Sequence, residues 1–169
     1  MTSTIEVADQ GSTLAYTFED LMRYHGPGSP GGVAHAFKVM ERVLPLLEPA
    51  GLVERHEVEV ETAFAGPGAR DGFEMVTRAV TEGRYVVDDA LARSELGATR
   101  ERFVFRLSYR GRSATVILRE GYVREEFIAL ARKEERTREE EGRLTVLKRE
   151  LADRLLADPA TDVYDIDDG

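Results

Sequence analysis

Apolar residues recur at helical spacing in several stretches of the chain. The clearest stretch covers residues 30–47, whose apolar positions are three or four residues apart: Val33, Phe37, Met40, Leu44 and Leu47. This spacing places the side chains on one face of an α-helix. Pro30 fits the first helical position, where no N–H is needed, and Ser29 is the expected cap.

Three further helices are predicted from capping residues and apolar stripes. Thr17 precedes a short acidic turn, which indicates a helix start. Asp71, with Glu74 three positions later, resembles the cap of a helix that ends at Gly83. The last long helix carries a stripe of leucines at positions 144, 147, 151 and 155.

Period-two alternation predicts a small sheet. Apolar and polar residues alternate over 58–62, over 103–109 and over 114–118, and the last two segments flank the turn Arg110-Gly111-Arg112, which indicates a β-hairpin. A short strand is expected over 84–88. The order of elements predicts an α+β fold in which a small sheet with a hairpin packs against helices. The expected organisation is a polar lead-in at 1–16, a core at 17–120, and C-terminal helices with an acidic tail at 121–169.

Composition narrows the function classes. The 169 residues carry a net charge of −9, with lysine and arginine mixed among acids. A nucleic-acid partner needs a clustered positive surface, so it is disfavoured, as is an anionic membrane. The chain has no cysteine and therefore no thiolate metal site or cysteine nucleophile. No apolar run reaches the roughly 20 residues that span a bilayer, and a cytoplasmic protein is expected.

The glycine- and proline-rich loop from Tyr24 to Gly32 is the main candidate site. His25 enters this loop where one helix ends, and its free pKa near neutrality suits a general acid or base. Glycines such as Gly28 let backbone N–H groups approach an anion beside Ser29 and the next helix start. The alternative is an elaborate connector in which His25 caps the preceding helix.

A second glycine loop, residues 65–68, precedes Arg70 and Asp71. Arg70 suits a carboxylate or phosphate, or is an ordinary surface arginine. Asp71 is an orienting group for a ligand or, more simply, a helix cap. Glu61 is either directed toward this loop or part of a solvated strand face. His35 is expected to be a partly buried structural residue, and His56 a surface residue. No two histidines are spaced four residues apart on a helix, so together they give only a weak indication of a metal site.

The order of these parts resembles the FmdE-like family, proteins similar to one of the subunits of formylmethanofuran dehydrogenase. The residues that carry the resemblance are Phe18-Glu19-Asp20-Leu21, Tyr24-His25-Gly26 and Pro30-Gly31. The family implies an α+β domain, often a homodimer, with a metal bound by loop histidine and cysteine. Here Pro27 stands at the second histidine, and Ser29 and Gly68 stand at cysteine positions, so no metal and no cofactor are expected.

Two functions remain open from the sequence. The first is a metal-independent enzyme that acts on a small polar or anionic metabolite. His25 would be its acid/base group, the glycine loops its anion site, and Tyr24, Gly28, Ser29, Glu61, Arg70 and Asp71 its binding residues. The alternative is a non-catalytic, dimeric ligand-binding or accessory subunit. A homodimer is expected in either case, because the leucine stripe of the last helix needs a surface to cover it.

Overall fold

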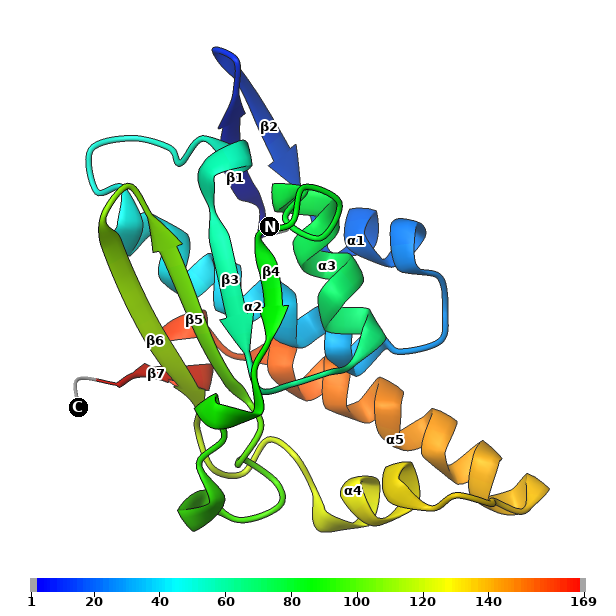
Figure 1. The fold of residues 1–169 in the computed structure, drawn as a ribbon. Coiled ribbons are helices and arrows are strands. Elements are labelled where there is room, and N and C mark those ends of the chain that lie inside the picture. Colours follow the sequence, from blue (N-terminus) through cyan, green and yellow to red (C-terminus); the bar gives the residue numbers. More distant parts are fainter. Residues whose placement is uncertain (1–2, 168–169) are drawn as a thin grey trace.

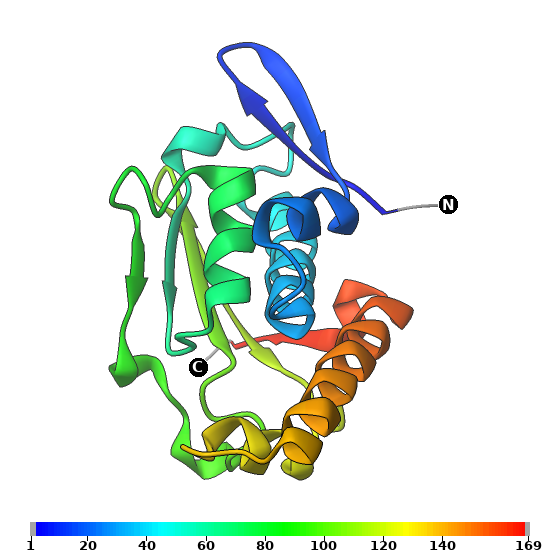
Figure 2. The ribbon, with the colours of Figure 1, turned by 90° about the vertical axis from the view of Figure 1, so that its right-hand side faces the viewer.

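A five-stranded mixed sheet is covered on one face by helices, as Figures 1 and 2 show. The computed structural model describes residues 3–167, and its α+β fold confirms the expected class. The strand order is β4-β3-β5-β6-β7, and a separate two-stranded sheet is formed by β1 and β2. The strands are β1 (Ile5–Asp9), β2 (Ser12–Tyr16), β3 (Glu59–Thr62), β4 (Tyr85–Val87), β5 (Val104–Tyr109), β6 (Arg112–Leu118) and β7 (Tyr164–Ile166). The helices are α1 (Phe18–His25), α2 (Pro30–Leu47), α3 (Pro67–Thr77), α4 (Glu125–Arg132), α5 (Arg138–Ala157) and α6 (Ala160–Val163), with 3₁₀ turns at Arg55–Glu57, Asp89–Leu91 and Ser94–Leu96.

Helix α2 is the centre of the fold and has the bounds that the apolar pattern predicts. Its stripe is buried, and Val33, Phe37 and Met40 are each at most 1% exposed. Ala34, Ala36 and Val39 are fully buried as well, so α2 is covered around most of its circumference by the sheet, α3 and α5. A helix of this kind derives its stability from burial rather than from propensity.

The N-terminal segment differs from the expected polar lead-in. Residues 5–16 form the β1–β2 hairpin, with Gln10 and Gly11 both at positive φ in its turn (52° and 88°). Such a two-residue turn matches the twist of antiparallel strands. The expectation of a polar lead-in is therefore wrong. The alternation of apolar and polar residues is too short to be recognised in the sequence, yet Ile5 and Val7 anchor β1 in the main core, where they are 4% and 0% exposed.

The C-terminal segment contributes side chains and a strand to the core of the fold. Residues Tyr164–Ile166 form β7, which pairs with β6 at the sheet edge, and the Tyr164 side chain is fully buried. On α5 the leucines at 144, 147, 151 and 155 are each at most 3% exposed within the single chain. The reason given for a homodimer, a half-covered leucine stripe, therefore does not hold.

Helix α3 begins and ends earlier than expected. It runs from Pro67, which fits the first helical position, to Thr77, and Arg78 then adopts the left-handed conformation at φ 60°. Asp71 therefore lies one turn inside the helix, and the interpretation of Asp71 as the helix cap is wrong.

Candidate functional site

His25 and Asp71 meet where α1 ends beside α3. The chain turns sharply after α1 because Gly26 adopts φ 90° and donates its N–H to the Met22 carbonyl. The His25 ring then lies against α3, with Nδ1 at 2.8 Å from Asp71 Oδ2. The two side chains are 8% and 25% exposed. A carboxylate on Nδ1 fixes the orientation of an imidazole ring and favours the proton on that nitrogen.

The other ring nitrogen of His25 is buried and has no hydrogen-bond partner among residues 3–167. A Cβ added at Gly28 would lie 3.9 Å from this Nε2 atom, so the nitrogen faces the underside of the glycine loop. A buried, unpaired ring nitrogen is uncommon in folded proteins. His25 is thus oriented as an acid/base group would be, while the loop separates it from solvent.

A cavity of about 360 Å³ is lined by the end of this loop, at Ser29, Gly31 and Gly32. We call it the α2–α3 pocket, because the first turns of both helices form one of its walls. The remaining walls come from the segment 98–103, from α4 and from α5. Its lining includes three phenylalanines and an isoleucine, Phe64, Phe103, Phe127 and Ile128. An apolar cavity of this size with polar groups at one wall is the usual form of a small-molecule site.

The two helices that begin at the pocket, α2 and α3, have no side-chain hydrogen bond at their N-caps. Neither Ser29 before α2 nor Gly66 before α3 provides a capping side chain, and neither helix has an acid in its first turn. By contrast, α1 and α5 each have a complete capping box and an acidic first turn. The expected Ser29 cap is therefore absent, and the first N–H groups of α2 and α3 are left for another acceptor.

Glycines allow the two helix starts to approach each other. A Cβ added at Gly68 would lie 2.5 Å from the Ser29 carbonyl oxygen, and one added at Gly32 would lie 3.0 Å from the Ala69 nitrogen. Both neighbours are backbone atoms, so no side chain can rotate away. These two glycines are therefore required by packing, and they bring both helix N-termini to one wall of the pocket.

The pocket has cationic residues along its rim. Arg102 and Arg132 are engaged with carboxylates, at 3.0 Å from Asp89 and 3.1 Å from Glu101. Lys148 of α5 has no carboxylate partner among the described residues, and its Nζ donates to the Gly28 carbonyl at 3.1 Å. Its ammonium therefore lies beside the uncapped start of α2, with its charge uncompensated.

The apolar wall is stacked on a neutral histidine. The rings of His35 and Phe103 are parallel within 20°, with centroids 4.4 Å apart. His35 Nδ1 lies 2.7 Å from the Tyr164 hydroxyl, and burial lowers the pKa of His35 to about 3. The side chain is therefore an uncharged part of the core at neutral pH, as expected of a structural histidine.

The structure brings some of the sequence-predicted site residues together and separates others. Arg70 joins the His25 pair, with Nε at 3.8 Å from Asp71 Oδ1, and Ser29 lines the pocket. Tyr24 is 52% exposed. Glu61 lies in β3 between two fully buried residues, Val60 and Thr62, so it points to the sheet face that the helices do not cover.

Sequence reasoning missed the residues that enclose the pocket from the second half of the chain. The alternation over 103–109 predicts only a strand for Phe103, and no pattern in the sequence singles out Lys148. Their proximity to Ser29 results from tertiary packing, for which the local pattern carries no signal.

A separate group of possible metal ligands lies beside the turn of the β1–β2 hairpin. Ligand atoms of Asp9, Glu54 and His56 lie within 4.8 Å of one another. A guanidinium nitrogen of Arg55 lies 3.4 Å from Asp9, and His56 Nδ1 lies 2.9 Å from Glu82. The Glu82 hydrogen bond, with a smaller contribution from Asp9, raises the pKa of His56. With Arg55 beside Asp9, positive charge is therefore already supplied by protein groups.

No protein-family model matches the chain, and no curated protein matches it. The FmdE-like resemblance therefore depends on the quoted residues alone. Among the described residues, no helix has the length and apolar character needed to cross a membrane.

Proposed function

We propose that the protein binds a small amphipathic anion in the α2–α3 pocket. The observation that carries this proposal is the meeting of two uncapped helix N-termini with the uncompensated ammonium of Lys148 at an apolar cavity. Free N–H groups at a helix start, together with the helix dipole, favour a negative group. A carboxylate or phosphate would supply the acceptors that both helices lack.

The apolar walls define the rest of the ligand. Phe103, Phe127 and Ile128 offer ring faces and methyl groups rather than hydrogen bonds, so a flat or branched hydrocarbon body fits them best. The FmdE-like resemblance supports the same location, because Ser29 and Gly68, which stand at its cysteine positions, both line this pocket.

A second candidate is a metal-independent acid/base enzyme. The observation that favours it is the His25–Asp71 hydrogen bond combined with the unpaired Nε2 of His25. Movement of the Gly28 loop would expose this nitrogen to the pocket, where it could transfer a proton to a bound ligand. Either function requires a ligand to bind in the α2–α3 pocket, so a binding measurement bears on both.

A pair of probes that differ in charge tests the binding proposal. We expect 2-naphthoate to bind with one-to-one stoichiometry in calorimetry and to shift the amide resonances of residues 29–32 and 66–69. We expect 2-naphthylmethylamine, which has a similar body and the opposite charge, to bind at least tenfold more weakly. Equal binding of the two probes, or resonance shifts confined to another surface, would overturn the proposal.

The homodimer stays a prediction without support from the leucine stripe. Tyr24 and the edge strand residues Val86 and Val87 are exposed to between 45% and 52%, and they are candidates for contact with a second copy. Light scattering at micromolar concentration is the measurement that decides it.

A further inference from the structure

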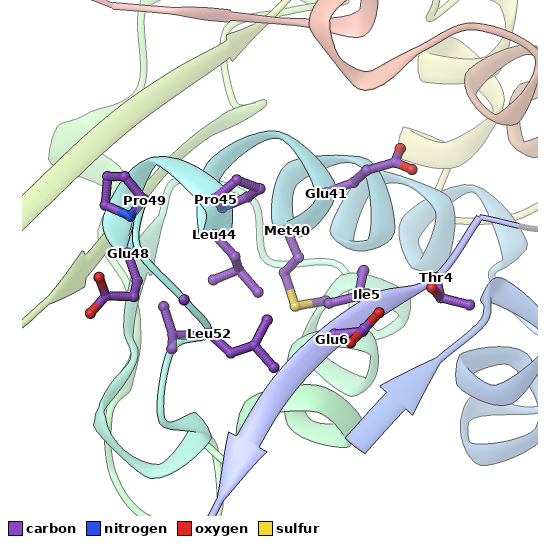
Figure 3. Close-up of a pocket in the computed structure, with 12 residues that line it drawn as sticks. Thr4, Ile5, Glu6, Met40, Glu41, Leu44, Pro45, Glu48, Pro49 and Leu52 are labelled. Carbon is purple, nitrogen blue, oxygen red and sulfur yellow. The ribbon is translucent and has the colours of Figure 1, made fainter. Parts of the chain in front are cut away.

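A second cavity, of about 420 Å³, lies between β1 and the C-terminal half of α2 (Figure 3). We call it the β1–α2 groove. Its lining comes from three segments: Thr4, Ile5 and Glu6 around β1, Met40, Glu41, Leu44 and Pro45 of α2, and Glu48, Pro49, Gly51, Leu52 and Val53 after the helix. None of these residues belongs to the α2–α3 pocket.

The floor of the groove is apolar. Figure 3 shows Ile5, Met40, Leu44 and Leu52 directed toward one another between the strand and the helix. The first three are buried, whereas Leu52 is 39% exposed at the open side. An apolar side chain entering here would be removed from water by groups already in place.

The outer edge of β1 is paired at Ala8, in an isolated parallel bridge with Glu54, and is unpaired at Glu6 beside this groove. In the β1–β2 ladder alternate residues direct their backbone groups toward the partner strand and away from it. Ala8 directs its N–H away from β2, because it donates to the Val53 carbonyl at 2.8 Å. Glu6, two residues earlier, therefore also points its N–H and C=O outward, and neither group has a backbone partner among residues 3–167.

The groove is bordered by acids. Glu6, Glu41 and Glu48 line it, and no lysine, arginine or histidine does. Glu41 is partly compensated by Lys38, whose Nζ lies 3.0 Å from Oε1. Glu6 is exposed and makes no ion pair with any described residue. The whole chain carries a charge of −9, which adds to the attraction of a cation.

We propose that the β1–α2 groove docks an extended, basic peptide segment of a partner protein, which adds a strand to the free edge of β1. The backbone of the segment would bond to the outward groups of Glu6. Its apolar side chains would enter the floor, and its lysines or arginines would meet the three glutamates.

The charge pattern argues against a second copy of this chain as the occupant. Pairing β1 with β1 of another copy would bring two sets of rim glutamates together, and opposed like charges are destabilising. A small cationic amphiphile would satisfy the floor and the rim but would leave the Glu6 backbone groups unpaired.

The proposal is tested with acetyl-Lys-Val-Lys-Val-Lys-Val-amide against the full chain. We expect saturable binding by fluorescence anisotropy of a labelled peptide, and slowed amide exchange at Glu6. We expect the affinity to fall several-fold between about 50 and 200 mM salt. The matched peptide with glutamate in place of lysine should not bind. Failure of the basic peptide to bind, or equal binding of the acidic one, would overturn the proposal.

Two variants separate strand addition from simple charge attraction. A lysine–valine peptide N-methylated at alternate residues keeps its charge but loses the donors of one edge, and it should bind at least tenfold more weakly. On the protein, Glu6→Pro removes the outward N–H without touching the β1–β2 ladder, whereas Glu6→Gln keeps it. We expect Glu6→Pro to abolish binding and Glu6→Gln to weaken it only several-fold. Unchanged affinity of the methylated peptide would contradict strand addition even if Glu6→Pro does not fold.

Discussion

Asp71 Oδ2 lies 2.8 Å from His25 Nδ1, although the two residues are 46 positions apart in the sequence. The contact joins the last residue of α1 to the second turn of α3. It therefore holds the start of the glycine loop against the helix whose N-terminus forms one wall of the α2–α3 pocket. Any ligand-dependent movement of that loop has to act against this hydrogen bond or leave it intact.

A double-mutant cycle on this pair measures its strength. His25→Asn and Asp71→Asn each remove a partly buried, charge-capable partner, and each should cost about 1–2 kcal/mol. That cost corresponds to a fall in Tm of roughly 2–8 °C for a chain of this size. The double variant should cost about 1 kcal/mol less than the sum, because the interaction can be lost only once. Urea unfolding of the four proteins gives this coupling energy, and strict additivity would show that the contact adds nothing to stability.

Two glycines in the neighbouring loops should respond differently to the same substitution. Gly68→Ala places a methyl group 2.5 Å from the Ser29 carbonyl oxygen, whereas Gly28→Ala places one 3.9 Å from His25 Nε2. The first requires the α2 and α3 backbones to separate, at a cost of about 1–3 kcal/mol or more. The second meets an ordinary contact distance and should change the stability by about 0.5 kcal/mol or less. Thermal unfolding of both variants checks the difference, and equal effects would contradict the packing role of Gly68.

The sequence predicted those elements whose own residues determine them. Helix α2 has the expected bounds because Pro30 and its apolar stripe both lie within the helix. The β5–β6 hairpin follows from alternation around the Arg110-Gly111 turn. Glycine richness at both loops was correctly associated with helix starts, and the structure shows that Gly32 and Gly68 are also required for helix packing.

Elements determined by distant partners were not predictable in this way. The alternation of β1 is too short to distinguish it from a polar lead-in, and it is stabilised by the burial of Ile5 and Val7 in the main core. Strand β7 lies in an acidic tail and is held by pairing with β6. Asp71 has the sequence context of a cap, but α3 already begins at Pro67, and the contact with His25, 46 positions away, could not be predicted from the local pattern.

Removal of the C-terminal segment should unfold the domain. A chain ending at Gly121 lacks Leu151, Leu155 and Tyr164, each at most 3% exposed in the core. Loss of one large buried side chain typically costs about 2–5 kcal/mol, so the loss of these three alone is comparable with the roughly 5–15 kcal/mol that stabilise most domains. Circular dichroism and amide dispersion of the truncated chain are the measurements. A folded truncation product would show that residues 122–169 form an accessory unit after all.

The charge of Lys148 should control anion binding in the α2–α3 pocket. Lys148→Met keeps the apolar stem and removes the ammonium that lies beside the uncapped start of α2. We expect the affinity for 2-naphthoate to fall about tenfold, or ~1.4 kcal/mol, with little change for 2-naphthylmethylamine. Lys133→Met is the matched control, because Lys133 is paired with Glu140 away from the pocket lining. If both variants bind 2-naphthoate like the parent protein, Lys148 is not part of the anion site.

Protonation of His35 in the unfolded chain should make the folded protein less stable in mild acid. Burial lowers the pKa of His35 from 6.5 to about 3, so between these values the unfolded chain takes up a proton that the folded chain does not. The free energy of unfolding then decreases as pH falls below about 6.5, by at most ~1.4 kcal/mol per pH unit for one proton. His56 has the opposite sign, because its pKa is raised mainly by Glu82. Its contribution is complete below about 6.5 and is lost as pH rises through its folded pKa.

A comparison with His35→Gln isolates the His35 effect. Glutamine is polar and can approach the Tyr164 hydroxyl, but it does not titrate. Both proteins retain His56 and the same surface carboxylates, so these contributions cancel in the difference between the two stability curves. We expect His35→Gln to be the less stable protein at pH 7.5 and the gap to narrow steadily between about pH 6.5 and 5. If the free energies of unfolding of the two proteins, measured in urea, instead run parallel over this pH range, His35 takes up its proton in the folded state as well. The assignment of a neutral His35 ring stacked on Phe103 would then be wrong.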